Sequence, residues 1–190
     1  MATVRVSWGR KLRVLDFDCE NRPLTYGGRD FTFSDITGIA WAWLDDGIVQ
    51  HELLYPGQNG IDITRFIEAY RQAGMVTCHN LIRHDLPEIG GRLLELGLPP
   101  LPPMLVHDTW AHLKKRQGIS ASQESLAEML GIEAPKIGMS QMKWRLANRL
   151  LPEGLAKTRE RVVGDVIQHQ ALRNRLLELG WLRPARVWQP

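Results

Sequence analysis

The stretch VLDFDCE, Val14 to Glu20, ends an apolar run with three acids at alternate positions. The apolar run predicts a buried β-strand, and alternate strand residues point to the same face, roughly 6.5–7 Å apart. Asp16, Asp18 and Glu20 would therefore share one face. Like charges on a buried face repel one another and are costly to desolvate, so the strand predicts a partner that neutralises them.

The composition is that of one ordinary globular domain. The 190 residues are 44% hydrophobic and 24% charged, with a formal net charge of +3, which permits an anionic partner without requiring one. Cys19 and Cys78 lie in predicted strands without a CxxC pattern, so we expect two free core thiols in a reducing compartment. The start MATVRVSWGRK has no apolar leader pattern, and no apolar run is long enough to span a bilayer. We therefore expect a cytoplasmic protein with no membrane partner.

The order of the predicted elements indicates an α/β fold. Residues 11–20 predict a strand, and residues 36–55 predict a hairpin around the turn Asp45-Asp46-Gly47. A helix over 61–74, a strand over 75–80, a helix over 85–97 and a strand over 104–107 follow; later segments are helical, the last over 154–180. We expect a mixed five-stranded sheet, its first three strands antiparallel, with helices on both faces. The tail over 180–190 should be loose or pack on the surface.

Three further aspartates stand at positions that suit a site. Asp85 follows a predicted strand and opens a helix, Asp108 ends the fifth strand, and Asp165 lies among valines in the last helix. A carboxylate on a buried helix face needs a cation or a donor. Mg²⁺ and Mn²⁺ prefer oxygen ligands, and two such ions about 3.5–4 Å apart can catalyse phosphodiester hydrolysis. Asp18, Glu20, Asp85 and Asp165 would form a suitable cage.

Simpler roles remain open for the same acids. An aspartate at a helix start, such as Asp85, is more often a cap. Asp108 precedes Thr109 and Trp110, so we expect it to cap the next helix and place it outside the metal shell. For Asp16 we favour a structural ion pair with a nearby Lys or Arg. Asp18 and Glu20, taken alone, could be solvated acids at a strand end.

Three segments resemble, in order, the three exonuclease motifs of the DEDD superfamily of 3′–5′ exonucleases: FDCENRP, HNLIRHDLP and VVGDVIQHQALRNRL. The chain is most similar to the branch related to the proofreading domain of family B DNA polymerases, seen as stand-alone domains in phage and bacterial genomes. The resemblance covers roughly residues 11–179, the core of a single domain over 1–190. It implies a ribonuclease H-like fold, two Mg²⁺ or Mn²⁺ ions held by Asp18, Glu20, Asp85 and Asp165, and hydrolysis at the 3′ end of single-stranded or frayed DNA, with Glu20 near the terminal 3′ hydroxyl.

One position departs from the third motif. The family carries a Tyr four residues before the motif's Asp or a His five before it, and this chain has Arg161 and Glu160 there. Arginine stays protonated and cannot act as a base, although it can hold a phosphate or pair with an acid. His169, one helical turn beyond Asp165, is our first substitute for orienting water, and His84 and His107 are others. The departure leaves open a catalytically impaired domain that binds nucleic acid or a protein partner.

Basic and aromatic side chains provide candidates for holding a single strand, since such sites combine cations with stacking rings. Trp144, between Lys143 and Arg145, is the best stacking candidate, with a core role as its alternative. Arg161 is a candidate phosphate contact. Lys143 is a further candidate substrate contact; Asn80 is expected to shape a turn, with a substrate contact as a further role, and Tyr26 to lie at the mouth of the site. The predicted partner is a DNA 3′ end, with RNA as an alternative; the oligomeric state is not predicted.

Overall fold

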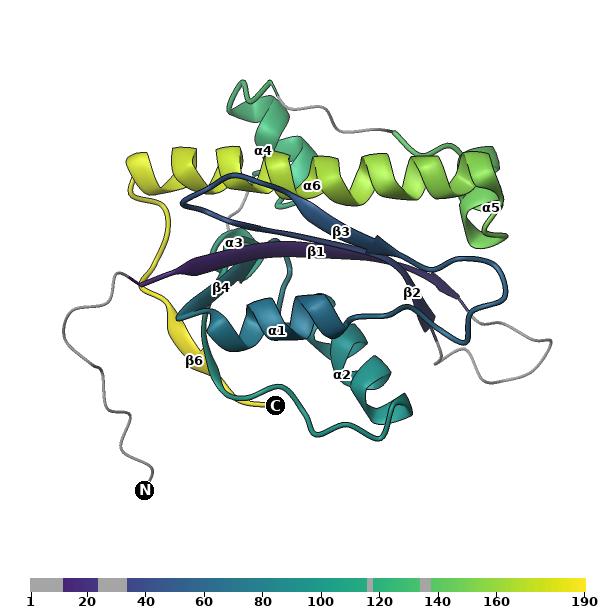
Figure 1. The fold of residues 1–190 in the computed structure, drawn as a ribbon. Coiled ribbons are helices and arrows are strands. Elements are labelled where there is room, and N and C mark those ends of the chain that lie inside the picture. Colours follow the sequence, from purple (N-terminus) through teal and green to yellow (C-terminus); the bar gives the residue numbers. More distant parts are fainter. Residues whose placement is uncertain (1–11, 24–33, 116–117, 134–137) are drawn as a thin grey trace.

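A single six-stranded sheet organises the computed structural model, which describes residues 12–23, 34–115, 118–133 and 138–190 (Figure 1). The strands are β1 (Val14–Pro23), β2 (Ser34–Trp43), β3 (Gln50–Leu53), β4 (Met75–Cys78), β5 (Met104–Asp108) and β6 (Arg186–Trp188), in the order β3-β2-β1-β4-β5-β6. β1, β2 and β3 are antiparallel neighbours, and β4 and β5 continue the sheet parallel to β1. The predicted ribonuclease H-like α/β fold, including the hairpin, is confirmed.

The C-terminal segment corrects the predicted strand count. Residues 180–190 were expected to form a tail that is loose or packs on the surface, but Arg186–Trp188 form β6 and pair antiparallel with β5, Met104 lying opposite Trp188. His107 reinforces this connection, since its Nε2 lies 2.8 Å from the backbone oxygen of Arg183. Trp188 also packs against the main core. The sheet therefore has six strands where five were predicted.

One face of the sheet is covered by α1 (Thr64–Gln72) and α2 (Asp85–Glu95), which lie below it in Figure 1. The main apolar core fills this layer. Phe17 of β1 meets Phe66 of α1 edge to face at 4.9 Å between ring centroids, and Trp41 of β2 meets the same ring. Trp41 and Trp43 are buried, and so are the free thiols of Cys19 and Cys78, as predicted. The core thus fixes β1 from one side.

The opposite face is covered by the long helix α6 (Pro152–Glu178), with α4 (Gln123–Met129) and α5 (Gln141–Asn148) beside it; α3 (Thr109–Leu113) follows β5 directly (Figure 1). Small residues on β2 let α6 approach the sheet: Gly38, Ala40 and Ala42 lie opposite Glu20, Asp18 and Asp16. A Cβ at Gly38 would lie 2.9 Å from Thr158 Cγ2 of α6. This close approach brings α6 onto the acidic face of β1.

α5 crosses α6 near the start of the long helix. A Cβ at Gly154 would lie 2.2 Å from the backbone of Leu146, so only glycine permits this crossing. The crossing fixes the position of Trp144, which lies in α5. Within the described residues, no helix combines the length and the apolar character that crossing a membrane requires.

Candidate metal centre

Two groups of acidic side chains meet at the end of β1, and Asp18 belongs to both. Asp18, Glu20 and Asp165 each place an oxygen within 4.8 Å of the others. Asp18, Asp85 and the thiol of Cys78 form the second group with the same spacing. β1, α2 and α6 are thus brought together by the fold, and the four predicted acids lie side by side although they are far apart in sequence.

Asp85 is the most deeply buried of these acids, with no exposed surface. Its Oδ1 accepts hydrogen bonds from the backbone N–H of Cys19 at 3.0 Å and from the Cys19 thiol at 3.2 Å, and its Oδ2 accepts one from the Cys78 thiol at 3.3 Å. The helix-capping alternative is wrong: the N-cap of α2 is His84, which makes no side-chain cap bond, and Asp85 is the first helical residue. The Asp85 carboxylate is instead held against the end of β1.

The two groups fit a hard divalent cation through their carboxylates. Burial raises the pKa of Asp18 well above its ordinary value, and the charges of Asp85, Asp165 and Glu20 raise it further. Burial likewise raises the pKa values of Glu20 and Asp85. Burial and the neighbouring acids also raise the pKa of the Cys78 thiol, which therefore remains protonated and donates to Asp85. The oxygen-rich donor set suits Mg²⁺ or Mn²⁺ better than a soft metal.

Arg161 of α6 lies against the first group. Its Nε donates to Glu20 Oε1, and its Nη2 lies 3.5 Å from Asp165 Oδ2. Its Cζ lies 5.4 Å from the ring centroid of Trp144. Two predicted substrate contacts, Arg161 and Trp144, are therefore in contact with each other at the edge of the acidic cluster. The guanidinium joins two of the acids predicted to bind metal.

Asp16 has a different partner from the one predicted. The favoured ion pair with Lys or Arg is replaced by His169, whose Nδ1 lies 2.8 Å from Asp16 Oδ1. His169 Nε2 lies 3.1 Å from the hydroxyl of Thr109, which in turn lies 2.8 Å from His79 Nδ1. Arg173 acts on Asp16 only electrostatically. Both ring nitrogens of His169, the histidine predicted to orient water, are therefore engaged inside the protein.

The other two histidines named as substitutes lie in different surroundings. His84 is half-buried beside the acids, and its proximity lowers the pKa values of Asp85 and Glu20 against the dominant effect of burial. His107 is tied instead to the segment after α6, through the contact of its Nε2 with the backbone oxygen of Arg183. The sequence signal for His84 was its position directly before Asp85. Of the three histidines, His84 is the one that interacts with the acidic cluster without being fixed in the Asp16 network.

Asp108 and Asn80 shape the loop before α2. Asp108 Oδ1 accepts from Ala111 N at 2.9 Å and caps α3, as predicted. The same carboxylate accepts from the backbone N–H groups of Asn80 and Ile82. Asn80 has a φ of 68°, in the left-handed region, and its backbone oxygen accepts from His84 N at 3.1 Å. The turn that delivers His84 and Asp85 therefore depends on Asn80 and Asp108.

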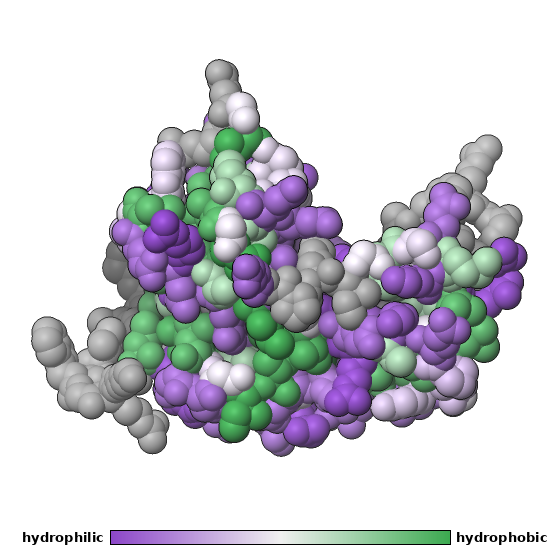
Figure 2. All heavy atoms as spheres, turned by 90° about the horizontal axis from the view of Figure 1, so that it is seen from above, coloured by the Kyte–Doolittle hydropathy of each residue, from purple (hydrophilic) through white to green (hydrophobic). Residues whose placement is uncertain are grey.

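Two further residues, Lys143 and Tyr26, were named as candidates for the substrate site. Lys143 lies in α5 next to Trp144, and its Nζ donates to the backbone oxygen of Gly138 at 3.0 Å. Tyr26 lies outside the described residues. Seen from the side of α6, the surface is uneven, and hydrophilic side chains lie beside apolar patches (Figure 2).

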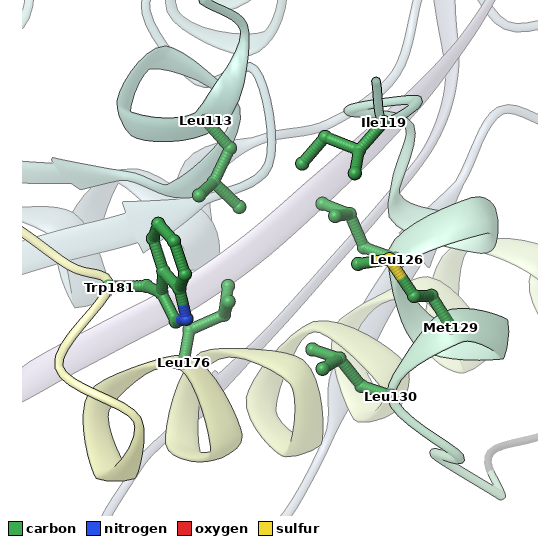
Figure 3. A pocket seen from close by; sticks show the side chains of 7 residues that line it. All are labelled: Leu113, Ile119, Leu126, Met129, Leu130, Leu176 and Trp181. Atoms are coloured by element: carbon green, nitrogen blue, oxygen red, sulfur yellow. The ribbon is translucent and has the colours of Figure 1, made fainter. Parts of the chain in front are cut away.

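An apolar pocket lies at the other end of α6. Figure 3 shows Leu113, Leu176 and Trp181 facing the side chains of α4 and of its flanking residues. The pocket has a volume of about 340 Å³. The full lining is Leu113, Ile119, Leu126, Met129, Leu130, Leu176 and Trp181. Trp181 thus lines this pocket, whereas Trp188 belongs to β6. None of the predicted site residues lines it.

The chain is similar to known proteins at the level of fold. No protein-family model matches it, and no curated protein matches it. Among solved structures it is similar to the family B DNA polymerase from the hyperthermophilic archaeon Pyrobaculum calidifontis, with a TM-score of 0.68 and 19% identity. The match covers 93% of this chain and 26% of the polymerase chain. The predicted resemblance to family B polymerases therefore holds for the fold.

Proposed function

We propose that the protein is a metal-dependent nuclease that hydrolyses phosphodiester bonds at the 3′ ends of single-stranded or frayed DNA. The carrying observation is that four acids from β1, α2 and α6 converge, with Asp18 common to both groups. Their burial raises the pKa values of three of them, so the site favours a bound cation. The similarity of the fold to part of a DNA polymerase supports the choice of a nucleic-acid substrate.

The carboxylates have distinct roles in this proposal. Asp18 would contact both ions, Glu20 and Asp165 would complete one position, and Asp85 would hold the other. Two Mg²⁺ or Mn²⁺ ions, when bound, supply an activated water and stabilise charge on the phosphate and the leaving oxygen. Asp85 is held by the Cys19 backbone and by two thiols, so its carboxylate is oriented before any ligand arrives. Preorganised ligands of this kind lower the cost of assembling the site.

We assign the water-orienting role to His84 in preference to His169. His84 is half-buried directly before Asp85 at the start of α2, near enough to lower the pKa values of Asp85 and Glu20, whereas both ring nitrogens of His169 are engaged by Asp16 and Thr109. A residue that orients water must reach the reacting centre, directly or through one water. His84→Gln should therefore slow hydrolysis with little change in the free energy of unfolding. His169→Gln should mainly reduce that free energy.

Trp144 and Arg161 are the proposed contacts for the DNA strand. A base can stack on an indole, and a guanidinium can bind a phosphate through two N–H groups. The two side chains are already stacked at 5.4 Å beside the acids, which places a cation and an aromatic ring at one edge of the site. Lys143, beside Trp144 in α5, and Asn80, in the loop before α2, are further proposed contacts.

The test is a digestion of 5′-labelled single-stranded DNA with Mn²⁺ or Mg²⁺. A ladder that shortens from the 3′ end, and that is absent with EDTA and with Asp18→Ala, is the expected result. Asp46→Ala, which removes an exposed acid in the β2–β3 turn, is the matched control and should cleave normally. An RNA strand of the same sequence identifies the preferred sugar. Intact DNA with either ion would overturn the proposal.

A specific observation favours a second candidate, a catalytically impaired domain that binds nucleic acid. Arg161 already bridges Glu20 and Asp165, and neither position 161 nor position 160 supplies a Tyr or His. Such a domain would bind the labelled strand in EDTA and leave it intact with Mn²⁺. Gel-shift measurement on the samples used for digestion separates the two candidates.

A further inference from the structure

The Arg161 guanidinium lies beside Glu20 and Asp165, where the proposed function would place a metal ion. The Arg161 guanidinium pairs with Glu20 and lies 3.5 Å from Asp165, and both are members of one three-acid group. Its side chain is 19% exposed, so the charge is only partly screened by water. Burial tends to lower the pKa of Arg161, but the charges of Glu20, Asp165 and Asp18 outweigh it and raise that pKa, so the group keeps its charge.

We propose that Arg161 is a built-in cation that competes with one divalent ion for Glu20 and Asp165, so that the free protein binds a single ion at Asp18 and Asp85. The proposal rests on the metal-dependent function above and adds a control of the same site. Asp85 supports it, because this acid is held by Cys19 and Cys78 and has no ion pair with an arginine among the described residues. We therefore expect the group of Asp18 and Asp85 to bind a metal ion before the group of Glu20 and Asp165.

Charge balance points in the same direction. Four carboxylates carry four negative charges, which two divalent ions would balance. With Arg161 in place, two ions would bring five positive charges against four, in a part-buried site where charge excess is expensive. One ion together with Arg161 brings three positive charges against the four negative ones. A phosphodiester supplies one more negative charge, so an incoming strand would favour both the second ion and the movement of Arg161 onto its phosphate.

Trp144 provides Arg161 with a second interaction partner besides the two carboxylates. The guanidinium already lies over the indole at 5.4 Å, an interaction that does not need Glu20 or Asp165. Arg161 can therefore leave the carboxylates while retaining its contact with the ring. This distinguishes it from an arginine fixed only by its acids.

The experiment counts bound Mn²⁺ in the absence of DNA, by calorimetric titration and by the electron paramagnetic resonance signal of free Mn²⁺. The native protein should bind one ion, with a second site weaker by about tenfold or more. Arg161→Gln should strengthen the second site by a similar factor. Arg175→Gln, on the same helix and paired with Glu178 on the surface, is the matched control and should bind as the native protein does.

A second variant covers the case in which Arg161→Gln fails to fold. Arg161→Lys keeps one positive charge but has no planar fork to bridge two carboxylates, so the second site should have intermediate affinity. Two ions of equal affinity in the native protein, or unchanged second-site affinity in both variants, would overturn the inference.

Failure of this inference and failure of the proposed function are distinguishable. If the protein hydrolyses DNA and its second-site Mn²⁺ affinity is the same in the Arg161 variants, the competition is wrong and the proposed nuclease function stands. If Arg161→Gln gains a second Mn²⁺ site but DNA stays intact in every digestion, the competition stands and the proposed nuclease function is wrong.

Discussion

Leu15, Phe17 and Cys19 point to one face of β1, and Asp16, Asp18 and Glu20 point to the other. The apolar face packs into the main core against α1 and α2, and the burial of its apolar side chains stabilises the fold. The acidic face meets α6, and each acid there has a different environment. Asp16 bonds to His169, Glu20 pairs with Arg161, and Asp18 is surrounded mainly by other acids.

The difference shows how one strand serves stability and chemistry at once. Period-two alternation separates the two roles, because a residue shifted by one position would move to the wrong face. On the acidic face the protein compensates the outer two acids and leaves the central one, Asp18, with a strongly raised pKa. Asp18, the least compensated of the three, is the acid that both proposed ion positions share.

The largest effect should come from Asp18→Asn, which removes the acid common to both groups. We expect nucleotide release to fall by about 10³-fold, because neither ion position keeps its shared ligand. The measurement is the initial rate of release from a 3′-labelled strand at saturating Mn²⁺, with circular dichroism to verify folding. A folded variant within tenfold of the native rate would show that Asp18 is a bystander.

Phe17→Ala tests the opposite face one residue away. Phe17 is fully buried against Phe66, so we expect the free energy of unfolding to fall by about 3–5 kcal/mol. Urea unfolding followed by tryptophan fluorescence measures it. Ile48→Ala, an exposed apolar residue near the β2–β3 turn, should change that free energy by less than about 0.5 kcal/mol. Equal losses from the two variants would remove the contrast between core and surface.

His169→Gln tests the compensation of Asp16. The buried carboxylate would lose its closest partner, and we expect a loss of about 1–3 kcal/mol in the free energy of unfolding. The double variant Asp16→Asn with His169→Gln should recover part of the loss, since a neutral amide pair replaces a buried charge. Thermal unfolding of the four proteins gives the coupling. Strictly additive losses would contradict the pairing.

A smaller effect is expected on the pH dependence of the stability of the metal-free protein. Burial raises the pKa values of Asp18 and Asp85, so the folded protein favours their protonated forms. The stability they contribute is fully present below the ordinary value of 3.8 and is lost as pH rises through the raised pKa values. The melting temperature in EDTA should therefore fall with rising pH in this window, and less steeply in Asp18→Asn. An identical slope in the two proteins would refute this explanation.

The smallest effect should come from Gly38→Ala, which changes how closely α6 approaches the acidic face. The new methyl group would lie 2.9 Å from Thr158 Cγ2, and we expect a loss of about 1 kcal/mol in the free energy of unfolding with weaker Mn²⁺ binding. Adding Thr158→Ser removes that methyl group, keeps the hydroxyl that donates to Gly154, and should restore most of both properties. No recovery in the double variant would place the strain elsewhere.

The first five strands and the four acids were predictable because their signals are local. An apolar run with alternate acids defines β1, and Asp85 and Asp165 stand out by their positions beside a strand and among valines. β6 was missed, since three residues between Pro184 and Pro190 are too few to show a period. Its pairing with β5 depends on where the chain returns after α6, which no local pattern encodes.

The partners of the acids were the least predictable part of the site. Arg161 and Asp165 are four residues apart on a helix, so their proximity was visible in the sequence. The contact of Arg161 with Glu20 and that of His169 with Asp16 join α6 to β1 across more than a hundred residues. Such contacts depend on how α6 lies on β2, and hence on Gly38 and its neighbours.

β6 also governs how copies of this chain can meet. With β6 in place, the outermost strand on that side has three residues and carries the exposed Arg186, features that discourage pairing with a foreign strand. If residues 186–188 detached, the backbone of β5 would become an open template for strand exchange between molecules. A purification tag fused after Pro190 would lie next to this strand, which β4 and β5 separate from β1 and its acids. Self-association caused by such a tag would therefore be a handling artefact at the sheet edge, separate from the chemistry at β1.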